Sequence, residues 1–215
     1  MPLQEMVHFL KRFCLLQVNI YIHKIYIHHP YILTNYHTLY DALGEGMRRK
    51  KILMLDLDIY NVKVSFSGPL LKEAQSWKSG NEKETALHSV VFDKLIHTRN
   101  DDASGISVNL NFVRGVTTHQ VVEAFNESFV GCDPVSTTLF KDTLRSSVGT
   151  SGVSAGDHIE FYWLNGGGLV ISVKGQVKGT IFNKEIEKRL LEVYIDPSRT
   201  VSPTLCTSLL NNLSQ

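Results

Sequence analysis

Apolar and polar residues alternate in several short stretches of the chain, and this alternation predicts β-strands. The clearest pair covers 158–164 and 169–173, joined by Asn165-Gly166-Gly167-Gly168. Asn-Gly supplies the positive φ angles that a tight hairpin turn requires. We therefore predict a β-hairpin here, with a further turn at Lys174-Gly175 into a third strand over 177–182.

Two earlier segments, 51–66 and 107–113, alternate in the same way and also predict extended structure. Between and after the strands, apolar residues recur at helical spacing. Thr117 and Asn183 precede two of these segments and can accept hydrogen bonds from free helical amides, and proline fits a first helical turn. The helices predicted in this way begin at Pro69, Glu82, Thr117, Pro134, Asn183 and Pro203. The residues predicted to face inward from the middle helices are Val121, Val122, Phe125, Phe129, Leu139, Phe140 and Leu144.

Strands and helices do not alternate one for one along the chain, so a parallel doubly wound sheet is not expected. The pattern predicts an α+β fold: an open antiparallel sheet with a helical layer on one face. The 215 residues fit one domain with an appendage.

Residues 1–40 differ in composition from the rest of the chain. They contain five of the nine histidines and five of the eight tyrosines, and the first serine of the chain is Ser65. We predict an atypical N-terminal segment over 1–40, which is an extra strand, disordered or the product of a mispredicted gene start, and a folded domain over 41–215. The segment is poor in serine and arginine, unlike a transit peptide, and has no secretory cleavage site, so we expect a soluble intracellular protein.

Composition and charge exclude some classes of function. Hydrophobic residues make up 43% and charged residues 20% of the chain, and the formal net charge is +1. No overall positive field favours nucleic acid, and no apolar run reaches the length of a membrane span, so we predict neither a nucleic-acid partner nor stable membrane insertion. The basic run 48–51 is typical of a solvated strand end, and less often of a phosphate-binding patch.

The cysteines and histidines do not form a metal-binding pattern. Cys14, Cys132 and Cys206 are scattered, without the spacing of a disulfide framework or a zinc site. His23, His28 and His29 have no cysteine or acidic residue near them in the sequence. We therefore predict no metal and no cofactor.

Two motifs suggest catalysis but fit ordinary structure better. The segment 152–156 matches the G-x-S-x-G pattern of hydrolases, yet a polar loop precedes it and a strand follows, whereas a nucleophile elbow needs a strand and then a helix. Asp56 and Asp58 could pair as acid and base, but solvated positions on a half-buried strand are the commoner explanation. The glycines at 44 and 46 are interpreted as a turn, and no catalytic residue is predicted.

Arg48 and Tyr60 form the most interesting pair of polar residues. A guanidinium offers two parallel donors to a carboxylate, and a buried phenol can donate a further hydrogen bond to the same group. Taken alone, each residue fits a structural ion pair or a core position better than a binding role.

Five segments resemble the chalcone-isomerase-like family in order and spacing, over about 170 residues. They are 43–51, 58–64, 110–116, 156–163 and 190–196, with Val201-Ser202-Pro203 after them. The resemblance is to the non-catalytic, fatty-acid-binding branch. It implies an open antiparallel sheet with a layer of helices and a ligand cleft between them.

The resemblance also implies roles for individual residues. Arg48 and Tyr60 occupy the two places that hold the fatty-acid carboxylate in that branch, and the enzyme has threonine at the second place. Thr118, Val122 and Phe125 are then possible cleft-lining residues on the following helix. The predicted function is binding or carriage of a long-chain fatty acid without catalysis.

Other functions stay open at this point. The alternative from a different class is an intramolecular lyase or isomerase of the chalcone isomerase type, and a third is a partner protein with an unused cleft. A plastid location is implied by analogy alone. Ligand chain length and oligomeric state are not predicted.

Overall fold

The computed structural model describes residues 40–52, 54–76, 105–164, 167–196 and 198–213. The chain falls into two compact units, Met1–Leu39 and Tyr40–Gln215. Everything below concerns the second unit. The N-terminal strand, the histidine cluster and the helix predicted from Glu82 lie outside the described residues, and the domain boundary near residue 40 stays a prediction.

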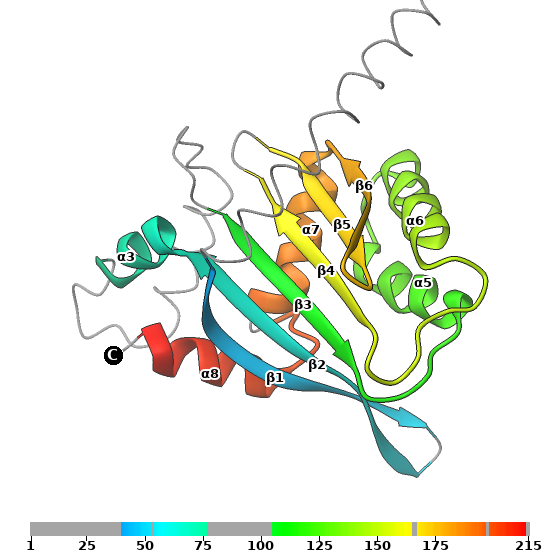
Figure 1. Cartoon of the computed structure of the whole chain (residues 1–215), viewed down its shortest axis with the longest axis horizontal. Coiled ribbons are helices and arrows are strands. Elements are labelled where there is room, and N and C mark those ends of the chain that lie inside the picture. Colours follow the sequence, from blue (N-terminus) through cyan, green and yellow to red (C-terminus); the bar gives the residue numbers. More distant parts are fainter. Residues whose placement is uncertain (1–39, 53, 77–104, 165–166, 197, 214–215) are drawn as a thin grey trace, which may run out of the picture. The chain divides into compact units, whose positions relative to one another are not determined.

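Six antiparallel strands form one sheet, and each strand pairs with its neighbours in the sequence (Figure 1). This order confirms the predicted open antiparallel sheet, because every pair of neighbouring strands is antiparallel. The strands are β1 (Tyr40–Ile52), β2 (Leu55–Ser67), β3 (Ile106–Phe112), β4 (His158–Trp163), β5 (Leu169–Val173) and β6 (Gln176–Ile181).

Helices follow the strands in the order that the sequence predicts. Gly68–Ser76 forms α3 directly after β2. The other helices among the described residues are α5 (Thr118–Asn126), a short 3-10 helix (Glu127–Phe129), α6 (Pro134–Val148), α7 (Lys184–Ile195) and α8 (Pro203–Leu213). No helix within the described ranges is long and apolar enough to cross a membrane.

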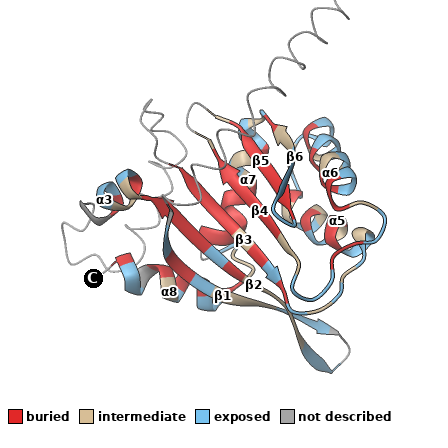
Figure 2. Ribbon diagram, in the orientation of Figure 1, coloured by how far each residue is buried: buried red, intermediate tan, exposed pale blue. Residues whose placement is uncertain are grey.

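The core lies between the sheet and the helices α5 to α8. Alternate residues of the central strands, such as Val108 and Leu110 on β3, are fully buried (Figure 2). Phe125 of α5 and Phe140 of α6 contact Phe161 of β4, with ring centroids 5.6 Å and 6.4 Å away. The Phe125–Phe161 contact is edge-on and the Phe140–Phe161 contact is tilted, and aromatic contacts of this kind add to the hydrophobic contribution of burial. The ring cluster therefore ties both helices to the middle of the sheet.

The predicted helix starts are confirmed by their hydrogen bonds. The Thr117 side chain accepts from the Gln120 amide, while the Gln120 side chain accepts from the Thr117 amide, which is a capping box. Asp133 accepts from the Ser136 amide before α6, and Asn183 accepts from the Glu185 and Ile186 amides before α7. Each cap satisfies backbone donors that a helix end otherwise leaves free.

The prediction that Leu139 faces inward is wrong. Its neighbours Phe140 and Leu144 are buried, but Leu139 is 49% exposed. One helical position corresponds to a turn of about 100°, so Leu139 falls beside the stripe that Phe140 and Leu144 form. Both Leu139 and Phe140 are apolar, so apolar character alone did not show which of the two side chains is buried.

The interpretation of the glycines at 44 and 46 as a turn is also wrong. Both lie inside strand β1, where Gly44 pairs with Val64 and Gly46 with Val62. Helix α8 crosses the strand at this point: a Cβ on Gly44 would lie 2.7 Å from Leu209 Cγ, and a Cβ on Gly46 would meet the backbone of Leu205. These glycines are therefore needed for the close approach of a helix to a strand.

Candidate functional site

Arg48 and Tyr60 lie directly opposite each other in the β1–β2 ladder. A bulge follows at once, since Arg49 pairs with Asp58 and the ladder skips a residue of β2. Opposite residues in an antiparallel pair point to the same face of the sheet. The two residues predicted to share a ligand are therefore neighbours, on the face that α8 covers.

The Arg48 guanidinium is partly buried and has an unusual set of partners. Its Nη1 donates a hydrogen bond to the Val201 carbonyl oxygen, 3.2 Å away, in the turn before α8. Within the described ranges it forms no ion pair, whereas the adjacent Arg49 pairs with Asp58 at 2.8 Å. A half-buried guanidinium has five donors and normally finds a carboxylate. Among the described residues, the guanidinium of Arg48 thus has a carbonyl partner but no carboxylate partner.

The Tyr60 side chain packs against the core by one face of its ring. Its ring meets Phe112 edge-on, with centroids 5.4 Å apart. Burial of the phenol raises the pKa of Tyr60 to about 12, although the nearby Arg48 charge and Tyr194 act in the opposite direction. At neutral pH the Tyr60 hydroxyl is therefore protonated and able to donate.

Sequence reasoning missed a third residue of this group, Tyr194 on α7. Tyr194 is fully buried, and its hydroxyl has no hydrogen-bond partner among the described residues. It lies close enough to Tyr60 that each phenol alters the pKa of the other, in part through interaction of the two hydroxyl groups, although Tyr194 Oη has no partner in good hydrogen-bond geometry among the described residues. Burial, followed by the proximity of Tyr60, raises the pKa of Tyr194 well above its ordinary value.

The sequence did carry a signal for Tyr194. It follows Leu190 by four positions, so it continues the inner stripe of α7, and it is the one phenol in that stripe. A buried tyrosine usually finds a partner for its hydroxyl. The unpartnered hydroxyl beside Arg48 and Tyr60 makes a site with two phenolic donors and one cation.

Two of the three α5 residues that were predicted to line the ligand cleft are part of the hydrophobic core in the described structure. Val122 and Phe125 are buried in the same apolar cluster against which Tyr60 packs. Thr118 begins α5, and its hydroxyl donates to the Gly149 carbonyl oxygen. That hydroxyl is thus occupied by the loop after α6. Whether these three residues contact a ligand stays a prediction.

The other chemical motifs of the sequence do not assemble into sites. Ser154 lies in the loop between α6 and β4, exposed to solvent, so the hydrolase interpretation is not supported by the local structure. Asp56 is exposed and Asp58 is paired with Arg49, as expected of solvated strand positions. Among the described residues no group of histidine, cysteine and acidic side chains is arranged to hold a metal ion.

A separate buried polar pair lies on the opposite face of the sheet. Asn109 Nδ2 donates to Glu160 Oε1 at 2.7 Å, and Glu160 Oε2 lies 3.9 Å from His158 Nε2. These residues alternate with Val108 and Phe161, which face the helices, so the pair points away from Arg48. It is not part of the Arg48 site.

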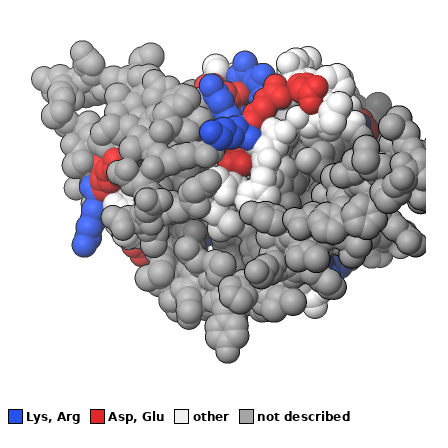
Figure 3. Space-filling view, turned by 90° about the horizontal axis from the view of Figure 1, so that it is seen from above, with Lys and Arg blue, Asp and Glu red and all other residues white. Residues whose placement is uncertain are grey.

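Charged side chains of both signs are visible on one face of the protein. Basic and acidic side chains lie next to one another on the face shown in Figure 3, in keeping with the net charge of +1. Attraction of an anion therefore depends on local groups such as Arg48 rather than on the whole molecule.

Comparison with known proteins agrees with this fold. The crystal structure of the fatty-acid binding protein AtFAP1 of Arabidopsis thaliana is similar, with a TM-score of 0.66 and 19% sequence identity. The match covers 81% of this chain and 88% of the Arabidopsis chain. No curated protein matches the sequence. The model of the family described as chalcone isomerase-like matches residues 94–210, more than half of the sequence, and the chain therefore belongs to the chalcone isomerase-like family.

Proposed function

We propose that the protein binds a long-chain fatty acid, with the carboxylate held by Arg48 and Tyr60 and with Tyr194 as an additional donor. One observation carries the proposal: Arg48 is partly buried without a described carboxylate partner, beside two protonated phenols, one of them unpartnered. A carboxylate is the anion that matches a guanidinium fork flanked by neutral donors. The shared fold with a fatty-acid binding protein supports the same ligand class.

The acyl chain contributes most of the affinity in this proposal. Each buried methylene stabilises the complex by about 0.8 kcal/mol, while a hydrogen bond to a charged group contributes about 1.5–3 kcal/mol. The chain would lie along the apolar cluster against which Tyr60 packs. The head-group residues then set the selectivity for an acid, and the tail sets the strength of binding.

Flavanone formation of the chalcone isomerase type has less support. Tyr60 stands where the resemblance places threonine in the enzyme. On α5 the Thr118 hydroxyl is bonded to Gly149, and Phe125 is part of the aromatic cluster. These side chains offer no free polar group to activate a chalcone. The plastid location stays part of the proposal by analogy, and imaging of a tagged protein would test it.

Native mass spectrometry of the purified protein tests the proposal directly. The wild-type protein should carry a co-purified lipid whose mass fits a long-chain fatty acid. Arg48→Gln should carry much less of this adduct, because the variant keeps a polar side chain but loses the charge that holds the carboxylate. Arg49→Gln is the matched control, since Arg49 is exposed and should leave the adduct in place. A bare wild-type protein that also fails to take up added fatty acid would contradict the proposal.

A further inference from the structure

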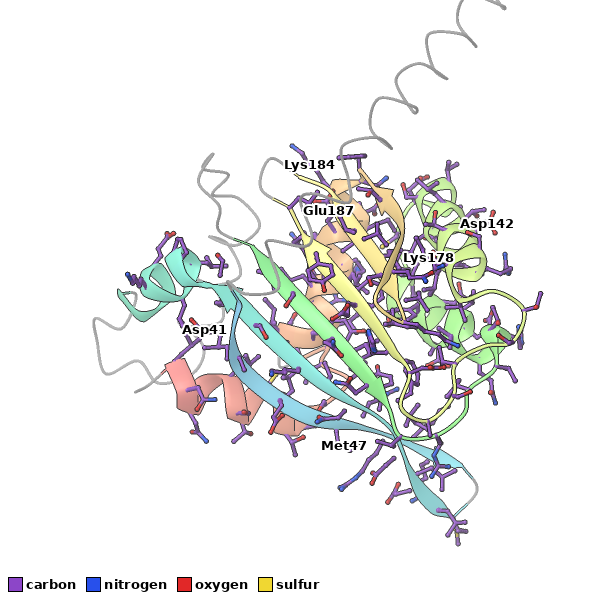
Figure 4. The ribbon with its side chains drawn as sticks, in the orientation of Figure 1. Asp41, Met47, Asp142, Lys178, Lys184 and Glu187 are labelled. Carbon is purple, nitrogen blue, oxygen red and sulfur yellow. The ribbon has the colours of Figure 1, made fainter. Side chains whose placement is uncertain are left out.

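The β1–β2 hairpin extends well beyond the rest of the sheet. β2 pairs with β3 over Tyr60–Phe66, and just beyond it the Val113 amide donates to the Ile59 carbonyl oxygen and Arg114 Nε donates to the Asp58 carbonyl oxygen. Among the described residues, no third strand lies beside residues 55–57 of β2 and the matching end of β1. Three residues of β-strand span roughly 10 Å. Figure 1 shows this end of the hairpin projecting from the sheet, and Met47, labelled in Figure 4, lies where it leaves β3.

The tip of this hairpin is apolar and exposed. Met54 in the turn is 89% exposed, and Leu55, the first residue of β2, is 65% exposed. Leu57 continues the same side of the strand. Large apolar side chains at a projecting turn lower the solubility of a protein unless another surface covers them. Their position therefore suggests a contact with a partner.

Basic residues accompany the apolar tip. Of the four consecutive basic residues, Arg48 faces the interior and Arg49 pairs with Asp58. Lys50 and Lys51 are exposed, and neither forms an ion pair within the described part of the chain, although Lys51 lies opposite the exposed Asp56 in the ladder, on the other face of the hairpin from Lys50. Lys50 lies opposite Leu57 in the ladder, so this lysine shares a face with the leucine side chains. A lysine beside apolar groups can keep its charge in the head-group layer while its stem lies along them.

We propose that the tip of the β1–β2 hairpin docks on an anionic lipid bilayer. Met54 and Leu55 enter the head-group layer, and Lys50 and Lys51 contact the anionic head groups. This is an interfacial contact and needs no membrane-spanning segment. A bilayer fits better than a protein surface, because a small apolar tip flanked by flexible cations matches a fluid anionic layer without a complementary pocket.

The location of the tip connects it to the proposed function, on which this part of the inference rests. The same hairpin carries Arg48 and Tyr60, about five residues of strand from Leu55. Long-chain fatty acids partition into bilayers because of the many apolar methylenes that water would otherwise surround. Docking by this hairpin would place the carboxylate site next to the source of its ligand.

Sedimentation of the full-length protein with vesicles tests the proposal without any added fatty acid. We expect binding to phosphatidylcholine vesicles with about 30% phosphatidylserine, weaker binding to phosphatidylcholine alone, and loss of binding as salt is added. The double variant Lys50→Glu, Lys51→Glu should lower the partition coefficient about tenfold or more, because each basic residue adds to the attraction. Met54→Asp should lower it on vesicles of either composition.

Two control variants make the same kinds of substitution at exposed residues away from the hairpin tip. Lys178→Glu, Lys184→Glu makes the same double reversal at exposed lysines away from the tip (Figure 4). Val135→Asp places a charge at another apolar residue, which is 77% exposed. Both controls should bind like the wild type. If the wild type does not bind, or if the tip variants bind as well as their controls, the proposal is wrong, whatever the outcome of the fatty-acid measurements.

Discussion

Tyr194 illustrates how one hydroxyl can be unfavourable for folding and favourable for binding. A buried polar group without a partner costs about 1–3 kcal/mol of stability. The proposed carboxylate, held by the neighbouring Arg48 and Tyr60, would supply the missing acceptor. The free energy lost in the unliganded protein is then recovered when the ligand binds.

Tyr194→Phe should therefore act in opposite directions on stability and binding. Without ligand, the variant should be as stable as the wild type or up to about 1 kcal/mol more stable, since the unpartnered hydroxyl is gone. Its affinity for a fatty acid should fall by roughly tenfold to 150-fold, the loss of one hydrogen bond to a charged carboxylate. Urea denaturation and fatty-acid titration measure the two effects. A variant that is clearly less stable, with unchanged affinity, would show that the hydroxyl has a structural partner instead.

The raised pKa of Tyr60 predicts how stability depends on pH. An unfolded tyrosine titrates near its ordinary value of 10.0, whereas the folded Tyr60 titrates at about 12. Between these values the folded state holds more protons than the unfolded state, so stability should fall as the pH rises from about 10 toward 12. Tyr60→Phe should reduce this slope when urea denaturation is measured across that pH range. An equal slope in the variant would mean that Tyr60 is not the group responsible.

At the scale of elements, the contact between β1 and α8 depends on small residues. Gly44 and Gly46 allow the helix to lie on the strand, and α8 in turn presents Val201, the acceptor of the Arg48 hydrogen bond, at the turn that precedes it. The position of the guanidinium thus depends on a helix that the sequence places more than 150 residues later. Sequence spacing alone could not reveal this contact, because the glycines are ordinary turn residues in isolation.

Gly46→Ala should weaken both the fold and the site. The added Cβ would meet the Leu205 backbone and lie 2.5 Å from Ser202 Oγ, so α8 must move. Overpacking of this kind costs typically about 1–3 kcal/mol, and the displaced turn should also lower fatty-acid affinity. Gly115→Ala is the control, because its Cβ would find its nearest neighbour 3.8 Å away. Equal free energies of unfolding for the two variants would contradict the close approach of α8.

At the scale of the whole molecule, the sequence predicted those strands and helix starts that depend on residues close together along the chain. Alternation identified β3, β4 and β5, and cap residues identified the starts of α5 and α7. The pairing of Arg48 with Tyr60 followed from a resemblance rather than from periodicity. What could not be predicted depends on contacts between distant segments: the hydroxyl of Tyr194, and the extension of the hairpin past β3.

The central claim is that Arg48 and its phenol neighbours bind a carboxylate, and a comparison of two ligands tests it most directly. Calorimetric titration of the delipidated protein with a fatty acid and with the alcohol of the same chain length isolates the head group. The wild type should prefer the acid by about 10-fold to 150-fold, the equivalent of one hydrogen bond to a charged group, and Arg48→Gln should lose this preference while still binding the alcohol. Equal affinities for acid and alcohol in the wild type would contradict the account.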